Sequence, residues 1–296
     1  MSDFDVTLVT YSRLPHLTPD DRLLAVELER RCMSVRAAVW SDEAIDWSAS
    51  TLTVLRSTWD YFHGPVEFLA WLDAAGSETS ILNSPALIRW NHDKHYLDSL
   101  DTYGVPTVPT VFADKASSVD LAEAAAMFET TELVIKPAIG GAAHGARRFA
   151  IGRDFDEAVN HLERLTASGC ALIQPFFESI LTERERSLVF LGSSFSHAYL
   201  KPPFSAGSMA GEAGEVVHVP EDSEFELARR ALASLDEVPA YARVDMALRD
   251  GRPHLMELEL IEPALHFHLA PGSEAVLADS LQRKLSEAAP KAGRAA

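Results

Sequence analysis

The sequence predicts an α/β protein, and three features of its pattern support this prediction. Short apolar runs typical of buried strands alternate with helical segments over residues 1–90. A second alternation of strands and helices covers residues 91–180, and strands dominate residues 181–296. We therefore expect three structural units with these boundaries, the first of them built on a parallel sheet.

The first unit is predicted to be a parallel sheet that binds a ligand at one edge. Strands are predicted at 6–10, 35–40 and 52–55, and helical spacing predicts a helix over 19–33. Ligands of such sheets lie beyond the carboxyl ends of the strands, where this chain has two polar segments. The residues of these segments that we expect to contact a substrate are Tyr11, Arg56, Ser57, Thr58, Trp59 and Asp60. The alternative is that both segments are surface loops with one structural Trp.

The second unit is expected to begin with a helix over residues 91–103. This helix carries Lys94 and ends at Gly104, ahead of a linker that contains Pro106 and Pro109. The pattern then predicts a strand, a helix, a strand at 133–135, a further helix and a strand at 170–174.

A glycine-rich loop follows the strand at 133–135. Lys136 ends that strand, and the loop contains Gly140, Gly141 and Gly145. Glycines allow the backbone to approach a ligand closely and to adopt positive φ. Because Ala146 and Arg147 stand where a Walker A motif has Lys-Ser/Thr, this loop is not a P-loop of that type.

The third unit is predicted to be rich in strands. They are expected at 187–191, 195–200, 216–219, 241–248 and 254–261, with helices at 223–235 and 273–285. A Gly-, Ser- and Ala-rich segment at 202–215 lies beside Lys201, and we expect it to form a lid over the site.

The composition excludes several classes of protein. The chain has 296 residues, 47% of them hydrophobic, and a net charge of −18, which indicates a globular protein that does not bind nucleic acid. It has no run of about 18 apolar residues that would predict a membrane span, and its N-terminus does not resemble a signal peptide. Two cysteines cannot form a disulfide framework, so we expect a cytoplasmic location.

A predicted hairpin near the C-terminus carries the strongest candidate site. Two alternating runs flank Gly251, and a loop of three or five residues centred there places Asp245 opposite Glu257. Side chains of a strand share a face every two residues, so Arg243 and Glu259 also lie on this face, opposite each other.

This pattern favours a metal–nucleotide site. Three carboxylates on one sheet face repel one another unless cations lie between them. Their oxygen atoms suit Mg²⁺ or Mn²⁺, which the phosphates of a nucleotide would also coordinate. The alternative is a solvated sheet face with Arg243 as its counter-ion, but Lys94 and Lys136 add the cations that a polyphosphate requires.

The order of these motifs resembles that of the ATP-grasp ligases. The motifs are Lys94, Lys136-Pro137 with its glycine loop, Gln174-Pro175-Phe176, Glu185-Arg186, Arg243-x-Asp245 and Glu257-x-Glu259. The resemblance covers nearly the whole chain and implies an ATP-grasp fold. In that fold, residues 1–90 form a substrate-side domain, residues 91–180 a linker helix and lid subdomain, and residues 181–296 the metal and phosphate subdomain.

The resemblance also implies roles for individual residues. ATP would be bound by Lys94, Lys136, Gly140, Gly141, Gly145, Gln174, Phe176, Phe177 and either Glu178 or Glu183. A pair of Mg²⁺ or Mn²⁺ ions would be held by Asp245, Glu257 and Glu259. Arg243 would contact the transferred phosphate, and Lys201 would add a further positive contact. Glu259 departs from the family, which commonly has Asn at this position.

The implied activity is that of an ATP-dependent carbon–nitrogen ligase. Such an enzyme activates a carboxylate as an acylphosphate, which a nitrogen nucleophile then attacks, largely through positioning and charge neutralisation. Segments at 56–61, 185–190, 196–203 and 256–263 are similar to the branch that cyclises O-ureido-D-serine to D-cycloserine. The alternatives are an intermolecular ligase of amino acids or peptides, and a non-catalytic nucleotide-binding regulatory module. The expected partners are a small amino-acid-like substrate and a second copy in a homodimer.

Overall fold

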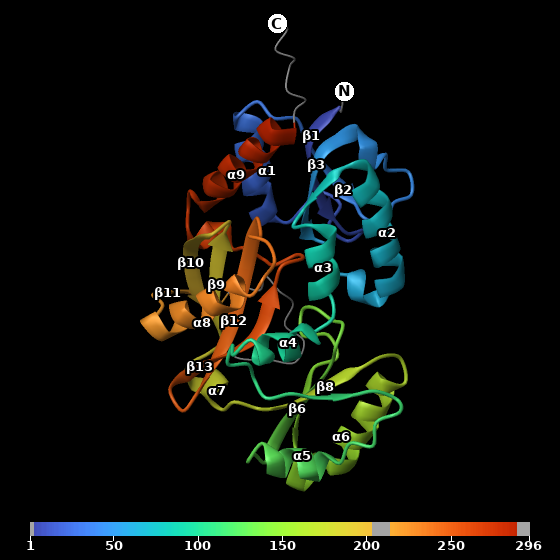
Figure 1. Cartoon of the computed structure of the whole chain (residues 1–296), viewed down its shortest axis with the longest axis vertical. Helices are drawn as coiled ribbons and strands as arrows, with labels where there is room; N and C mark the ends of the chain where they lie inside the picture. Colours follow the sequence, from blue (N-terminus) through green and yellow to red (C-terminus); the bar gives the residue numbers. More distant parts are fainter. Residues whose placement is uncertain (1–2, 203–213, 289–296) are drawn as a thin grey trace, which may run out of the picture.

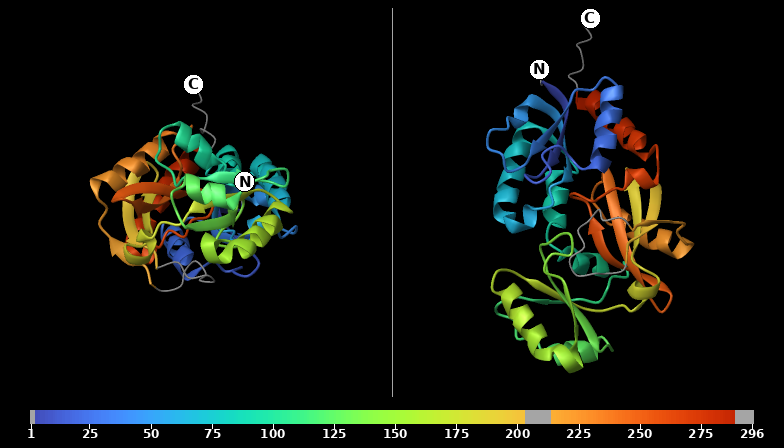
Figure 2. Two further views of the ribbon diagram at one scale, coloured as in Figure 1. Left: turned by 90° about the horizontal axis from the view of Figure 1, so that it is seen from below. Right: turned by 180° about the vertical axis from the view of Figure 1, so that it is seen from behind.

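The computed structural model describes residues 3–202 and 214–288, and this part of the chain contains three β-sheets. The N-terminal sheet lies at one end of an elongated molecule, the sheet of residues 111–175 at the other, and the third sheet between them (Figures 1 and 2). The predicted α/β class is confirmed. Among the described helices, none is both long enough and apolar enough to cross a membrane. Most of the predicted lid, residues 203–213, lies outside the described residues.

The N-terminal sheet is parallel throughout, as predicted, with the strand order β2-β1-β3-β4. Its elements are β1 (Phe4–Thr10), α1 (Pro19–Arg30), β2 (Val35–Val39), β3 (Ser50–Ser57), α2 (Pro65–Glu78) and β4 (Ser80–Leu82). The Thr18 hydroxyl accepts a hydrogen bond from the Asp21 amide and caps α1, whose first helical residue is a proline.

The last helix of the chain also belongs to this layer. α9 (Ser273–Ala288) packs beside α1, and Leu277 and Leu281 enter the same core as Leu24 and Leu28 (Figure 1). The chain therefore returns to the N-terminal sheet after completing the third sheet.

The sheet of residues 111–175 is antiparallel, with the order β5-β8-β6-β7. Its elements are β5 (Val111–Ala113), α5 (Leu121–Met127), β6 (Glu132–Pro137), β7 (Arg147–Ala150), α6 (Ile151–Thr166) and β8 (Ala171–Pro175). The sequence did not predict β7, because its four residues RRFA contain no clear apolar alternation. β6 and β7 form a hairpin, so both ends of the glycine loop are fixed in this sheet.

The third sheet is also antiparallel and has the order β11-β10-β9-β12-β13. Its elements are α7 (Ser179–Thr182), β9 (Arg186–Leu191), β10 (Ser194–Leu200), β11 (Val216–His218), α8 (Asp222–Ala233), β12 (Tyr241–Arg249) and β13 (Arg252–Glu259). The predicted strands of this unit are confirmed within one or two residues at most ends.

The hairpin of β12 and β13 has the predicted pairing for a different reason. Its turn is the two residues Asp250 and Gly251, both with positive φ, and not a loop of three or five residues. That turn alone would place Asp245 opposite residue 256. A β-bulge there shifts the register by one residue, so that Asp245 pairs with Glu257 and Arg243 with Glu259.

The predicted helix over residues 91–103 is present only as a shorter helix at its C-terminal part, and Lys94 lies in a turn before it. The turn separates α3 (Pro85–Asn91) from α4 (Tyr96–Thr102). The Lys94 amide donates to the Ala138 carbonyl at 3.0 Å instead of to a helical carbonyl, and the Asp93 carboxylate accepts from the His95 amide at 3.0 Å. Tertiary contact with the glycine loop therefore ends α3.

Arg56 lies in the core and not in a surface loop. β3 continues to Ser57, and the fully buried Arg56 guanidinium pairs with Asp21 at 3.0 Å and donates to the Pro263 carbonyl at 2.8 Å. This hydrogen bond joins the N-terminal unit to the third unit, because Pro263 follows the third sheet.

We predict that Arg56→Leu lowers the free energy of unfolding by about 3–5 kcal/mol, since it leaves the Asp21 carboxylate buried without its partner. Arg30→Leu is the control, because Arg30 pairs with Glu27 on the surface of the same layer. Urea denaturation measures both variants. Equal midpoints for the two variants would show that the buried pair is not a structural requirement.

Candidate functional site

A cavity of about 270 Å³ is lined by residues from all three units. β6, β8 and the glycine loop contribute one wall, and β12 and β13 contribute another. Trp59 and Tyr61 follow β3 and line the cavity on the side of the N-terminal sheet. The cavity therefore brings together residues from Trp59 to His266, which lie far apart in the sequence.

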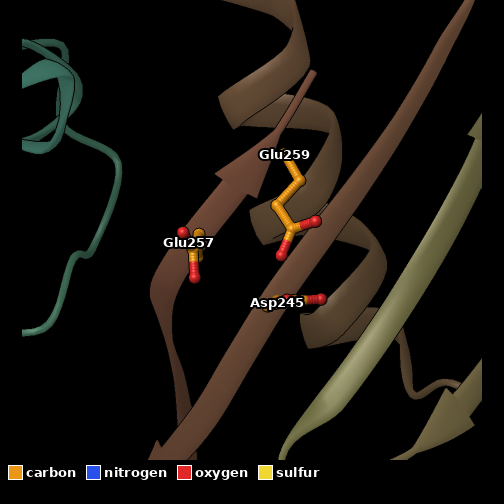
Figure 3. Close-up of side chains that lie close together, drawn as sticks. All are labelled: Asp245, Glu257 and Glu259. Carbon is orange, nitrogen blue, oxygen red and sulfur yellow. The ribbon is translucent and has the colours of Figure 1, made fainter. Parts of the chain in front are cut away.

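The hairpin presents three carboxylates to this cavity (Figure 3). One oxygen each from Asp245, Glu257 and Glu259 lies within 4.8 Å of the others. Asp245 belongs to β12 and the two glutamates to β13, and the bulge aligns them on one face. The predicted acidic face is thus present as a compact cluster.

Three cations surround these carboxylates. Arg243 binds Asp245 at 2.9 Å and also pairs with Glu259. Lys94 lies 3.0 Å from Glu257. Lys201, at the end of β10, pairs with Asp245 and lies 3.3 Å from Glu185. The cluster is therefore internally neutralised.

The neighbouring cations shift the pKa values of the three acids in different directions. Burial alone would raise the pKa of each acid, but Arg243 and Lys201 hold the pKa of Asp245 well below its usual value. Lys94 and Lys136 likewise lower the pKa of Glu257. At Glu259, burial outweighs the attraction of Arg243 and raises the pKa to about 7. Asp245 and Glu257 are therefore the carboxylates that keep their charge most firmly.

The lysines on the other wall of the cavity face the same cluster. The Lys94 ammonium donates to the Gly140 carbonyl at 2.5 Å, which joins the acidic face to the glycine loop. Lys136 comes from β6, and burial lowers the pKa of its ammonium, although Glu257 opposes this effect. Lys136 has no ion pair among the residues that the structure describes.

The glycine loop lies partly against the cavity. Gly140 and Gly141 line it, whereas Gly145 does not. A Cβ on Gly141 would contact the Phe62 ring at 3.5 Å and the Glu262 carboxylate at 3.6 Å. Gly145 has a φ of +71° and packs against Pro137, so its role is to shape the loop.

The segment that follows β8 supplies an apolar region of the cavity. Gln174, Phe176 and Phe177 line it, as the sequence analysis expects of an adenine site. The expectation that Glu178 or Glu183 lies near the ribose does not fit the cavity. Glu178 is exposed, and Glu183 lies 3.3 Å from Arg186 outside the lining. Glu185 lines the cavity instead.

The expected substrate segments reach the cavity only at Trp59. Arg56, Ser57 and Thr58 are fully buried, and Asp60 accepts a hydrogen bond from the Trp40 indole at 2.6 Å. Tyr11 is buried as well, with its ring 6.4 Å from that of Trp59. Tyr61 and Glu262 also line the cavity; they lie within the segments 56–61 and 256–263 but were not among the expected site residues, and neither was His266, which lines it as well.

The donor atoms of the acidic cluster are suited to a divalent cation. All its donors are carboxylate oxygens, the preferred ligands of Mg²⁺ and Mn²⁺. The adjacent lysines and Arg243 suit the phosphates that such an ion accompanies in a nucleotide site.

Sequence comparisons identify the family of this chain. Residues 6–83 match the model of the N-terminal domain of D-cycloserine synthetase DcsG. The cycloserine biosynthesis protein DcsG of Streptomyces lavendulae is 32% identical over an alignment of 279 positions, which covers 86% of this chain and 91% of that protein. The chain belongs to the DcsG family of ATP-grasp ligases.

Solved structures have the same fold. The crystal structure of D-cycloserine synthetase DcsG has a TM-score of 0.85 and 28% identity, with 95% of this chain and 99% of that one covered. D-alanine–D-alanine ligase from Bacillus anthracis, solved in complex with ATP, has a TM-score of 0.64 and 15% identity, with 96% and 99% covered. The fold is therefore that of the ATP-grasp ligases, and this member of the DcsG family is an ATP-dependent ligase.

We predict that Lys136→Ala weakens ATP binding by about 1.5–3 kcal/mol, because it removes a charge-assisted contact to phosphate. Lys115→Ala is the control, since this exposed lysine belongs to the same unit but lies outside the cavity. Calorimetric titration with ATP measures both. An unchanged ATP affinity in Lys136→Ala would exclude Lys136 from the nucleotide site.

Proposed function

We propose that this chain cyclises O-ureido-D-serine to D-cycloserine at the expense of ATP. The observation that carries the proposal is the composition of the cavity. The cations and carboxylates of an ATP-grasp site meet there with Trp59 and Tyr61, which lie within the residues that match the DcsG N-terminal domain. The cycloserine-forming relatives support the choice of substrate.

The nucleotide half of the site lies between the sheet of residues 111–175 and the third sheet. Gln174, Phe176 and Phe177 contact the adenine, and Gly140 and Gly141 close over the phosphates. Lys94 and Lys136 bind phosphate oxygens as point charges. Asp245, Glu257 and Glu259 hold the divalent cations, which neutralise phosphate charge when bound.

The reaction begins with transfer of the γ-phosphoryl group to the substrate carboxylate. A carboxylate oxygen forms a bond to phosphorus, the bond to the leaving oxygen breaks, and ADP departs. Arg243 and Lys201 border the acidic cluster and stabilise the charge on the transferred group. The protein therefore needs positioned cations and no covalent nucleophile.

The ring closes within the activated substrate. The aminooxy-type nitrogen attacks the acyl carbon, inorganic phosphate leaves, and the five-membered isoxazolidinone forms. The carbamoyl group departs with one water molecule as carbon dioxide and ammonia. The net reaction consumes ATP, substrate and water, and it yields ADP, phosphate, carbon dioxide, ammonia and D-cycloserine.

We predict ADP release with Mg-ATP and O-ureido-D-serine, accompanied by a product with the mass of cycloserine. The L-isomer is assayed beside it and is expected to react more slowly. A coupled ADP assay and mass spectrometry record both quantities. Absence of ADP with both isomers, together with ADP release from a mixture of an amino acid and an amine, would identify an intermolecular ligase instead.

A further inference from the structure

Most charged side chains around the cavity have a partner of the opposite type. The lining carboxylates with a cationic nitrogen within 4.0 Å are Asp245, Glu257, Glu259 and Glu185. Glu215 lies 4.0 Å from His266, but burial lowers the pKa of that imidazole to about 3, so it is a neutral neighbour. The lining cations with a carboxylate partner are Lys94, Lys201 and Arg243. Within the described ranges, the charged lining residues without a charged partner are Lys136, Glu215 and Glu262.

Unpaired charged groups in a mostly matched cavity indicate where a ligand supplies the opposite charge, because burying an isolated charge is costly. The proposed function gives Lys136 its partner, the phosphates of ATP. It gives no partner to Glu262, since ATP is anionic and Glu262 does not belong to the described acidic cluster. A second, cation-bearing ligand would supply that partner.

Glu262 lies on the substrate side of the cavity. It follows β13, and its backbone carbonyl accepts a hydrogen bond from the Trp59 indole at 3.1 Å. Its carboxylate reaches the glycine loop, where a Cβ on Gly141 would lie 3.6 Å from an oxygen. The carboxylate thus lies near both the N-terminal unit and the loop over the phosphates.

The surroundings of Glu262 suit an organic cation. Trp59 and Tyr61 line the same part of the cavity, and aromatic faces attract ammonium groups. Burial, with a smaller contribution from Glu262, raises the pKa of Tyr61 well above its usual value, which keeps this ring neutral. Burial also raises the pKa of Glu262 to about 8, and Glu259 adds to this effect. Arrival of a cation would favour the charged carboxylate.

We propose that Glu262, together with Trp59 and Tyr61, binds the α-ammonium group of the substrate and thereby selects α-amino acids over carboxylic acids without that group. This assignment rests on the proposed function for the identity of the amino acid. In this proposal Glu262 determines substrate specificity. Arg243 and Lys201 stabilise the transferred phosphoryl group.

The test compares two substrates in the wild type and in one variant. O-ureido-D-serine is compared with its analogue without the α-amine, 3-(ureidooxy)propanoate, in wild type and Glu262→Gln. KM and kcat for ADP release, and the KM for ATP, are measured for each pair. We expect the wild type to favour the amino acid by about 10- to 100-fold in KM, as one charge-assisted contact implies. In Glu262→Gln this ratio should fall towards one through a higher KM for the amino acid, with the KM for ATP unchanged.

Two further variants act as controls. Glu262→Asp retains the carboxylate and should keep part of the preference. Glu215→Gln changes another lining carboxylate, one that lies 4.0 Å from His266, and should keep the wild-type ratio. A wild-type ratio in Glu262→Gln, or an equal rise in KM for both acids, would overturn the assignment.

Failure of the proposed function gives a different result. In that case the wild type releases no ADP with O-ureido-D-serine, and the comparison is repeated with whichever amino acid of a panel does release it and with its own deaminated counterpart. Loss of the preference in Glu262→Gln would then support the ammonium site with another substrate. A wild type that activates only acids without an α-amine would overturn it.

Discussion

Charge balance on one face of a β-hairpin is the constraint on which the site depends. Asp245, Glu257 and Glu259 would repel one another within 4.8 Å if they faced an apolar cavity alone. Arg243, Lys94 and Lys201 come from three different segments of the chain and offset that repulsion. The cluster therefore holds the strand hairpin, the turn after α3 and the end of β10 in one arrangement.

The same balance prepares the cavity for its ligands. Each cation that now pairs with a carboxylate could instead bind a phosphate oxygen. The carboxylate that it leaves could then bind a divalent cation. Under the proposed assignment, binding of metal and nucleotide would exchange these partners without leaving a buried charge alone. Lys136 and Glu262 lie outside this exchange, and the proposed phosphate and ammonium ligands would supply their partners.

Much of this arrangement could be predicted from the sequence. Period-two alternation on both sides of Gly251 indicated the hairpin and placed Arg243 opposite Glu259. The bulge opposite Asp245 could not be predicted, because no residue type marks it, and the expected loop length happened to compensate for it. The parallel order of the first strands followed from alternating strands and helices.

Tertiary contacts account for what the sequence could not predict. Lys94 was assigned to a helix because its neighbours have helical propensity, whereas hydrogen bonding to Ala138 ends that helix. Arg56 is predicted from the sequence to contact a substrate, because it follows a strand of a parallel sheet, whereas in the structure it pairs with Asp21, which is distant in sequence. The significance of Glu262 depends on which charges are paired, and only the folded chain shows this.

The central claim is that the acidic cluster is neutralised internally until nucleotide draws its cations away. Mn²⁺ binding, followed by electron paramagnetic resonance with and without a non-hydrolysable ATP analogue, tests this claim directly in wild type and Glu257→Gln. The account predicts weak Mn²⁺ binding by the wild type alone, tight protein-bound Mn²⁺ once the analogue is present, and loss of that tight site in Glu257→Gln. Equally tight Mn²⁺ binding without nucleotide, or an unchanged site in Glu257→Gln, would contradict it.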